Sequence, residues 1–283
     1  MKSEFKIVFA ETTSSDSFYR FLQVIFHLFP EDKFHHLLRT KSQELATDEA
    51  IYQSVQAGLP AIRPFMQPLT YALPALRKQK REMARQVQQI LGDRREIKGY
   101  LEIGSTGRYI SELKNRVKVQ DGIFLTNDIH PDYSLAEIFE RGQLSKLGQF
   151  FDLNDYRPID AAIVPDQSVD VVTCHIGLHH CPTDRLQEYL ASIHRILRPG
   201  GLFVLRDHDV TTPAMDTFVS LVHTVFNLGL NAPWETNQKE YRSFNSVAHW
   251  VREVEAAGFS DMGFRLLQDL DPSMNTLMGF VRK

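Results

Sequence analysis

Features typical of secreted, membrane-spanning or disulfide-stabilised proteins are missing from this sequence. Its 283 residues include only two cysteines, Cys174 and Cys181, too few for a disulfide framework. The opening stretch MKSEFKIVFAETTSSD lacks the hydrophobic core and cleavage site of a signal peptide. No apolar run reaches the ~18 residues of a spanning helix. We therefore expect a protein without a membrane span, in a reducing, cytoplasmic setting.

Positive and negative charges nearly balance, since the formal net charge is only −3. Such a balance gives no broad attraction to nucleic acid or to an anionic membrane. The basic residues between 77 and 85 could touch RNA, but a solvated helix face is the preferred interpretation. The sequence also has no internal repeat and no low-complexity tract. We expect no nucleic-acid partner.

The first 95 residues follow a helical pattern. Between residues 18 and 29, phenylalanine, leucine and isoleucine recur at three- and four-residue spacing until Pro30 stops the run. Further helices are predicted over 31–46 and 74–91, the second ended by Gly92 as a C-cap glycine. A looser, proline-rich stretch lies between them, at 58–74. We predict a helical N-terminal cap or lid over 1–95.

Short apolar strands alternate with helices after residue 95. Strands are predicted at 99–103, 122–128, 148–153, 168–176 and 202–207, with two more around the turn Asp271-Pro272-Ser273. Helices are predicted at 108–116, from an N-cap at Thr183 to the stop Pro199-Gly200-Gly201, at 211–229 and at 246–257. This alternation predicts an α/β fold with a mainly parallel sheet and helices on both faces. In such sheets, ligands bind beyond the carboxyl ends of the strands.

The first of these strands opens into a loop with two glycines, Gly104 and Gly107. Glycine permits positive φ and a close approach to a ligand, but a purely structural turn is equally compatible with the pattern. Neither a G-x-G-x-x-G fingerprint nor a phosphate-binding loop is present. Glu102 before the loop disfavours a pyrophosphate and suits an ammonium or hydroxyl groups. Asp128 ends the next strand, where a carboxylate commonly accepts hydrogen bonds from ribose, although it could instead cap the turn that follows.

Three further segments carry a family resemblance: PDQSVDVV, then LHH, then LRPGG before a strand. Together with LEIGSTGRY, Asp128 and Asp152, they resemble the class I S-adenosylmethionine-dependent methyltransferases, in particular their small-molecule branch. The resemblance covers about residues 97–207. It implies a Rossmann-like, seven-stranded sheet with an antiparallel C-terminal strand in a domain over 96–283, and S-adenosylmethionine as cofactor. The glycine loop is one residue shorter than the family pattern and lacks its central glycine.

The resemblance also implies positions for the cofactor. Glu102 would contact the methionine amino group through the loop or a water, and Gly104, Ser105, Thr106 and Gly107 would cradle the methionine moiety. Asp128 and Ile129 would border the ribose, Asp152 and Leu153 the adenine, and His175 would line the cofactor through its backbone.

Methyl transfer often requires a base that removes a proton from the acceptor. His208 lies between Asp207 and Asp209 after the fifth strand, so we predict that it is the base and that one of these carboxylates orients its ring. A packing or substrate-binding role is the alternative. His180 is a second candidate, although Leu-His-His segments are often structural.

Metal and thiol chemistry are disfavoured by the same segment. A metal site built from His175, His179, His180, Cys174, Cys181 or Asp207 is conceivable but not expected, because a strand ends there and Cys174 is predicted to lie within the sheet. Neither cysteine has an activating partner in the sequence, so a cysteine nucleophile is not expected either.

An acceptor pocket is predicted from the cap and from a helical insertion at 211–250. Its candidate residues are Tyr19, Phe26, His179, Met215, His223 and Trp234. An aromatic pocket favours a small, partly apolar acceptor, whereas core or dimer packing is the alternative and leaves a homodimer open. The Asn/Asp-Pro-Pro-aromatic motif of many nucleic-acid methyltransferases is replaced by Cys-His-Ile-Gly at 174–177, which argues against DNA base methylation.

The sequence thus predicts a small-molecule methyltransferase, acting at oxygen rather than nitrogen. Two alternatives stay open. One is a methyltransferase-like scaffold or accessory protein that has lost productive cofactor binding, as the short loop suggests. The other is a different nucleotide-dependent enzyme on a Rossmann-like sheet.

Overall fold

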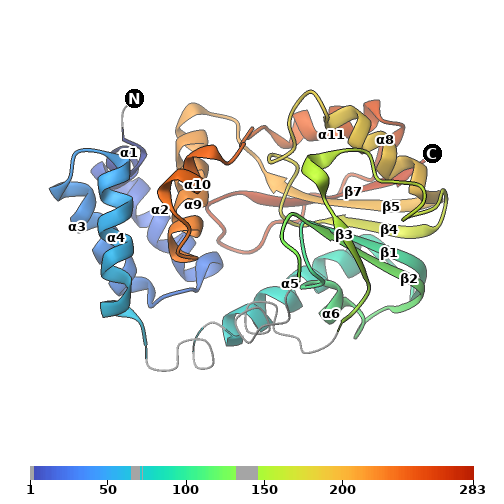
Figure 1. Cartoon of the computed structure of the whole chain (residues 1–283), viewed down its shortest axis with the longest axis horizontal. Coiled ribbons are helices and arrows are strands. Elements are labelled where there is room, and N and C mark those ends of the chain that lie inside the picture. Colours follow the sequence, from blue (N-terminus) through green and yellow to red (C-terminus); the bar gives the residue numbers. More distant parts are fainter. Residues whose placement is uncertain (1–2, 65–70, 72, 132–145) are drawn as a thin grey trace.

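The computed structural model describes residues 3–64, 71, 73–131 and 146–283. Figure 1 shows a twisted sheet with helices on both faces and a separate group of helices beside it. The strands are β1 (Glu96–Ile103), β2 (Lys118–Asn127), β3 (Gln149–Asp152), β4 (Val169–Cys174), β5 (Leu197–His208), β6 (Phe259–Asp261) and β7 (Asn275–Arg282). The helices along the sheet are α5 (Leu73–Leu91), α6 (Ile110–Leu113), α8 (Leu186–Ile196) and α11 (Val247–Ala256).

The strands form one sheet, seven-stranded in the described part of the chain, in the order β3-β2-β1-β4-β5-β7-β6. Strands β1 to β5 pair in parallel, and β7 runs antiparallel to both β5 and β6. The predicted Rossmann-like, mainly parallel sheet with an antiparallel C-terminal strand is confirmed. Because the five parallel strands point the same way, the ends of β1, β2, β4 and β5 meet at one edge.

Helices cover the sheet on both faces (Figure 1). Alternate side chains of β4 serve the two layers: Val172 packs with α8 and α11, whereas Val171 packs with α5 and α6. A central strand buried on both faces is apolar nearly throughout, as the sequence pattern requires. Leu190 of α8 and Val87 of α5 are among the buried residues of the two layers.

A second core lies beside the sheet. It is formed by six helices that we call the cap helices: α1 (Glu4–Ala10), α2 (Thr12–Phe21), η1 (Leu22–Phe26), α3 (Glu31–Glu44), α4 (Asp48–Ile62) and α9 (Pro213–Gly229). The short helix α10 (Trp234–Lys239) follows α9. Helices far apart in the sequence meet in this core: the rings of Phe18 in α2 and Phe218 in α9 lie 5.7 Å apart between centroids. The proposed domain boundaries stay predictions, and α5, inside the first 95 residues, packs on the sheet rather than with the cap helices.

The first helical run ends in a π-helical turn. The predicted helix stops at Phe26 rather than Phe29, because His27 takes a left-handed conformation with φ 47°. π-Turns are rare and often mark functional sites. Among the described residues, none of the helices has the length and apolar character needed to cross a bilayer.

Three sequence predictions were wrong in detail. Helix α4 occupies part of the stretch predicted to be loose, with Thr47 as its N-cap and Pro60 tolerated in its last turn. Helix α8 begins at Leu186, so Thr183 is not its N-cap; the Thr183 hydroxyl instead bonds the Tyr241 hydroxyl at 2.8 Å.

The third error concerns the C-terminal strands. Only β7 follows the turn at 271–273 as a strand, and before the turn Leu266 makes an isolated bridge to Leu277. The antiparallel partner of β7 on its outer side is β6. Positive φ at Gly263 (79°) and Leu270 (62°) prevents the intervening stretch from forming a continuous strand.

Candidate active site

The glycine loop joins the ends of three strands. Gly104 has φ 74°, and its N–H donates to the Thr126 carbonyl of β2 at 2.7 Å. A Cβ at position 104 would lie 2.0 Å from Cδ1 of Ile176, in the segment after β4. Ser105 closes the loop because its Oγ accepts from the N–H groups of Gly107 (3.2 Å) and Arg108 (3.0 Å). Glycine at 104 is therefore required both by its φ and by the close approach of β4.

Glu102 fixes the helix that follows this loop. Its buried carboxylate accepts hydrogen bonds from the N–H groups of Tyr109 (3.1 Å) and Ile110 (2.7 Å) and from the Tyr100 hydroxyl (3.1 Å). Carboxylates are stabilised at a helix N-terminus by its free N–H groups. Glu102 thus ties α6 to β1, and its contact with a methionine amino group stays a prediction.

Carboxylates gather at the ends of β2 and β3. Burial raises the pKa of Asp128, and the negative charges of Asp155 and Asp152 raise it further. Asp152 forms an ion pair with His130 at 2.7 Å. Ile129, predicted beside the ribose, is 74% exposed. Three carboxylates this close provide hydrogen-bond acceptors for hydroxyl or amino groups of a ligand.

A cavity of about 520 Å³ opens next to these carboxylates, and Thr126, Asp152, Leu153 and Tyr189 are among its lining residues. Asp128 and Ile129 do not line it. The structure therefore brings the predicted adenine-side residues, Asp152 and Leu153, to the wall of one cavity.

His175 follows β4 and lies against the glycine-loop side of the site. Its ring packs on Tyr109 with the centroids 4.4 Å apart, and its buried Nδ1 has no hydrogen-bond partner among the described residues. Burial, and then the charge of Arg206, lowers the pKa of His175 to about 3. A buried imidazole nitrogen without a partner is an available contact for a ligand.

Asp207 organises the histidines at the end of β5. Its carboxylate accepts from the N–H groups of Leu178 (2.7 Å), His179 (3.2 Å) and His208 (2.8 Å) and pairs with Nδ1 of His179 at 2.8 Å. Burial raises the pKa of Asp207 to about 6, so the carboxylate is ionised at neutral pH. Asp207 is therefore a buried anchor for the segment after β4.

The orientation of the His208 ring corrects a sequence prediction. Nδ1 of His208 lies 2.6 Å from the Ser273 carbonyl, while Asp207 reaches only the backbone N–H of His208. Asp209 instead accepts from the N–H of Val247 at the start of α11. The ring is thus oriented by a carbonyl from the turn before β7, not by Asp207 or Asp209. Because a carbonyl can only accept, Nδ1 carries the proton and Nε2 keeps its lone pair.

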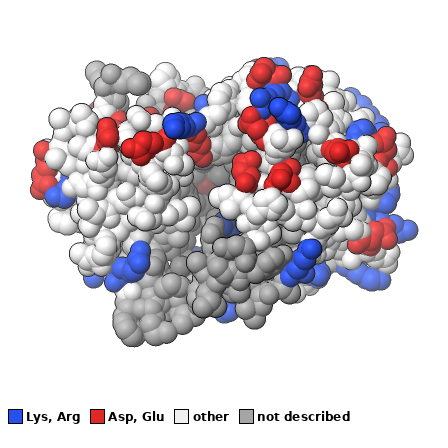
Figure 2. Space-filling model, viewed as in Figure 1, with Lys and Arg blue, Asp and Glu red and all other residues white. Residues whose placement is uncertain are grey.

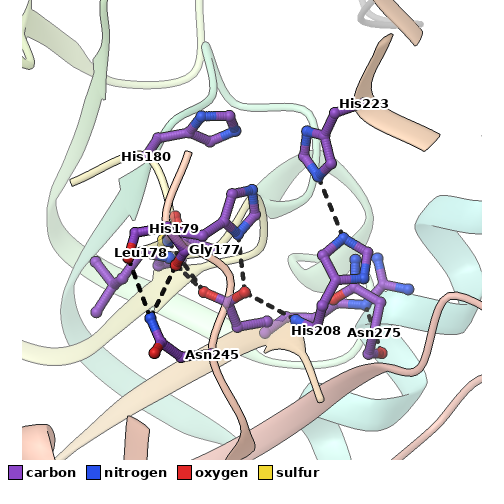
Figure 3. A network of polar contacts seen from close by, with 12 residues as sticks. Gly177, Leu178, His179, His180, His208, His223, Asn245 and Asn275 are labelled. Atoms are coloured by element: carbon purple, nitrogen blue, oxygen red, sulfur yellow. Dashed lines mark hydrogen bonds and ion pairs between the residues drawn. The ribbon is translucent and has the colours of Figure 1, made fainter. Parts of the chain in front are cut away.

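Three more histidine rings lie close to that of His208, as Figure 3 shows: those of His179, His180 and His223. Nε2 of His223, on α9, lies 3.3 Å from Nε2 of His208. The ring of His179 lies 4.2 Å from that of His180 and 4.7 Å from that of His223 between centroids. Burial lowers the pKa of His179 to about 3 and those of His180 and His208 to about 4, so these rings are neutral at pH 7.

A second cavity, of about 370 Å³, separates the cap helices from the strand ends. Its wall includes Phe21 and Phe26 from the cap helices, Tyr109 and Ile176 from the loops after β1 and β4, and His180, His208 and His223 from the histidine group. We call it the cap cavity. The π-turn contributes Ile25 and Phe26 to its wall.

The structure brings only some of the predicted pocket residues to the cap cavity. Phe26 and His223 line it, whereas Tyr19, His179, Met215 and Trp234 do not. Tyr19 instead packs on His35, Trp234 packs on Tyr52, and Met215 packs against the core of the cap helices.

Other lining residues were missed. Phe21 belonged only to the predicted helical run at 18–29, and Ser273, in the turn before β7, and Asn275, in β7, had no sequence signal for this role. The turn signal Asp271-Pro272-Ser273 predicted a loop, but nothing in the sequence predicted that this loop lies against the end of β5.

Lys and Arg are interspersed with Asp and Glu on the face shown in Figure 2. On this face the described residues form no extended basic patch, consistent with the small net charge.

Comparisons with known proteins agree with this arrangement. Residues 101–205 match the family model described as a methyltransferase domain. The ubiquinone/menaquinone biosynthesis C-methyltransferase UbiE of Methylobacterium nodulans is 28% identical over 116 residues, which cover 38% of this chain and 45% of that protein. The chain thus matches less than half the length of this relative.

Two solved structures share the fold over nearly the whole chain. An O-methyltransferase family protein from Burkholderia thailandensis has a TM-score of 0.50 and 15% identity, covering 95% of this chain and 68% of its own. The CurJ carbon methyltransferase has a TM-score of 0.50 and 16% identity, covering 95% and 70%.

The matched residues 101–205 run from β1 to β5 and include the glycine loop, Asp128 and the segment before Asp207. They are the part of the chain that builds the strand ends described above. The fold, the match and the motifs identify this part of the chain as a class I S-adenosylmethionine-dependent methyltransferase domain.

Proposed function

We propose that this chain transfers the methyl group of S-adenosylmethionine to a hydroxyl oxygen of a small, partly apolar acceptor, with His208 as the general base. The observation that carries the proposal is the fixed His208 ring. Its Nδ1 is held by the Ser273 carbonyl, and the ring lines the cap cavity beside residues that flank the glycine loop.

The residues at the ends of β1, β2 and β3 fit the cofactor. Asp128 and Asp152 offer acceptors to ribose hydroxyls and to the adenine amino group. The buried Nδ1 of His175, after β4, has no hydrogen-bond partner among the described residues and is available to a ligand. Gly104 and Gly107 allow the chain to turn closely above β1. When bound, S-adenosylmethionine would supply the electrophilic methyl group.

The cap cavity fits the acceptor. Its volume of about 370 Å³ is in the range of small-molecule sites, and its wall combines aromatic rings with a few polar groups. Tyr109 and Ile176 line it. Tyr109 follows the glycine loop in the sequence, and Ile176 lies against Gly104 in space. Enclosure by the cap helices would exclude water and hold the acceptor in line with the donor.

The His208 ring can perform proton removal. Burial lowers its pKa to about 4, with the neighbouring His179 contributing, so the neutral form dominates at pH 7. Nε2 then holds a lone pair that can take the hydroxyl proton as the oxygen attacks, once the acceptor hydroxyl displaces the 3.3 Å contact with Nε2 of His223. A cytoplasmic location, a homodimer and the absence of nucleic-acid partners stay predictions from the sequence.

Replacing Asp128 by alanine is expected to raise the Kd for S-adenosylhomocysteine by about 10–100-fold, because hydrogen bonds to a charged group contribute ~1.5–3 kcal/mol. Isothermal titration calorimetry of the intact chain measures this directly. Asp93→Ala is the matched control, since Asp93 is an exposed aspartate in the turn before β1. Equal affinities in all three proteins would remove Asp128 from the site. No binding by the unmodified chain would instead favour the non-catalytic scaffold.

A further inference from the structure

Three histidines beside the cap cavity form a group with the chemistry of a metal centre. His179, His180 and His223 each offer one ring nitrogen, and these three atoms all lie within 4.8 Å of one another. The first two follow β4, and the third belongs to α9 among the cap helices. We propose that these three side chains bind a divalent transition-metal ion of the zinc class.

His179 has the hydrogen bonding of a metal ligand. Its Nδ1–H donates to the Asp207 carboxylate at 2.8 Å, so its Nε2 keeps a lone pair. That Nε2 is buried and has no partner among the described residues. Histidines that bind metals almost always donate their other N–H to a carboxylate or a carbonyl. Here Asp207 is itself fixed by three backbone N–H groups.

His180 shows the same arrangement with a carbonyl. Its Nδ1 lies 3.2 Å from the carbonyl oxygen of Tyr241, which can only accept, so Nδ1 donates and Nε2 is free to bind. The carboxylate of Glu240 lies 3.5 Å from the same nitrogen. The two rings after β4 are thus each held from behind by an oxygen acceptor.

His223 completes the group from the opposite side. Because Nδ1 of His208 donates to Ser273, Nε2 of His208 can only accept, and Nε2–H of His223 therefore donates to it across 3.3 Å. Nδ1 of His223 then also carries a lone pair. Phe244 packs on both His179 and His223, with centroids 5.0 and 5.1 Å away, and limits access of water from that side.

The donor set selects the metal. Imidazole nitrogens suit zinc and its neighbours rather than magnesium or calcium, which prefer oxygen. Ligand nitrogens in a tetrahedral zinc site lie about 3.4 Å apart, given Zn–N bonds of ~2.0–2.1 Å. The nitrogens, which lie within 4.8 Å of one another, need to approach by at most about 1.4 Å, a change that ring rotations can supply.

The arrangement leaves a fourth position open. Three histidines plus a water or substrate is the pattern of catalytic rather than structural zinc sites. His180 and His223 line the cap cavity, so the open position faces it and would take a water or an oxygen of a bound molecule. That this oxygen is the acceptor hydroxyl rests on the proposed function, whereas the metal site itself does not.

The test is metal binding by the intact chain after chelator treatment and dialysis. Titration with Zn²⁺, in competition with a chromophoric chelator, is expected to show one saturable site. Co²⁺ should give the visible absorption of a tetrahedral nitrogen site. His180→Ala and His223→Ala should each weaken Zn²⁺ binding by at least about 100-fold, since losing even the hydrogen-bond partner of a metal ligand costs about 10–100-fold.

His194→Ala is the control, because His194 is similarly half-buried but lies on α8 away from the group. It should bind Zn²⁺ as the unmodified chain does. Circular dichroism of the metal-free variants separates loss of a ligand from loss of fold. Absence of a saturable site in the folded chain, or Zn²⁺ binding that is unchanged in both folded variants, would overturn the proposal. Neither readout requires methyl transfer, so failure here leaves the proposed function standing, and failure of cofactor binding leaves the metal site standing.

Discussion

Replacing His208 by alanine is expected to lower the turnover number for methyl transfer to a hydroxyl acceptor by about 10²–10⁴-fold, the usual contribution of a positioned general base. The loss arises because Nε2 of His208, on a ring that the Ser273 carbonyl holds in place, carries the lone pair that takes the proton when the acceptor hydroxyl displaces His223. The Kd for S-adenosylhomocysteine should change by less than about twofold. Formation of S-adenosylhomocysteine during turnover, together with calorimetry, measures both quantities.

A lowered turnover number together with an unchanged Kd for S-adenosylhomocysteine identifies a base. His194→Ala, remote from the site on α8, should leave both unchanged. A His208→Ala chain that turns over at the unmodified rate would remove His208 from the base role. A parallel loss of cofactor affinity would assign His208 to binding instead.

Replacing Asp207 by alanine is expected to lower the free energy of unfolding by about 3–5 kcal/mol, because it leaves several buried hydrogen-bond donors unpaired at ~1–3 kcal/mol each. The carboxylate is fully buried and accepts three backbone N–H groups in addition to Nδ1 of His179. All four donors would lose their acceptor, and each buried donor left unpaired is costly. Urea unfolding of the metal-free chain, monitored by circular dichroism, measures the effect.

Asp209→Ala is the matched control two positions away. Asp209 is half-buried and accepts one backbone hydrogen bond, from Val247 at 2.8 Å. Its loss should cost only about 1 kcal/mol. Equal unfolding midpoints for the two variants would contradict the role of Asp207 as the anchor of the segment after β4.

The sheet was predictable from the sequence because its signals are local. Apolar strands such as the one ending at Cys174, and the helix stop at Pro199-Gly200-Gly201, each depend on a few neighbouring residues. The topological rule that gathers parallel strand ends then placed the glycine loop and Asp128 at one edge without any knowledge of contacts. The helix at Asp48–Ile62 had a local signal too, in Thr47 followed by two acidic residues, but Pro60 obscured it.

The details of the histidine group were not predictable. Sequence adjacency made Asp207 and Asp209 the natural partners of the His208 ring, yet Ser273, 65 positions further along, holds it. His223 comes from a helix whose position depends on the core of the cap helices. Which ring nitrogen carries a proton follows only from such long-range contacts, and so does the position of His223 beside His179 and His180.

A crystal structure of the chain with S-adenosylhomocysteine bound would show directly where the cofactor lies. We expect the ligand at the carboxyl ends of β1, β2 and β4, with its ribose hydroxyls hydrogen-bonded to Asp128 and its sulfur directed toward the cap cavity and His208. Ligand bound at any other surface of the protein, or with its sulfur turned away from that cavity, would contradict this expectation.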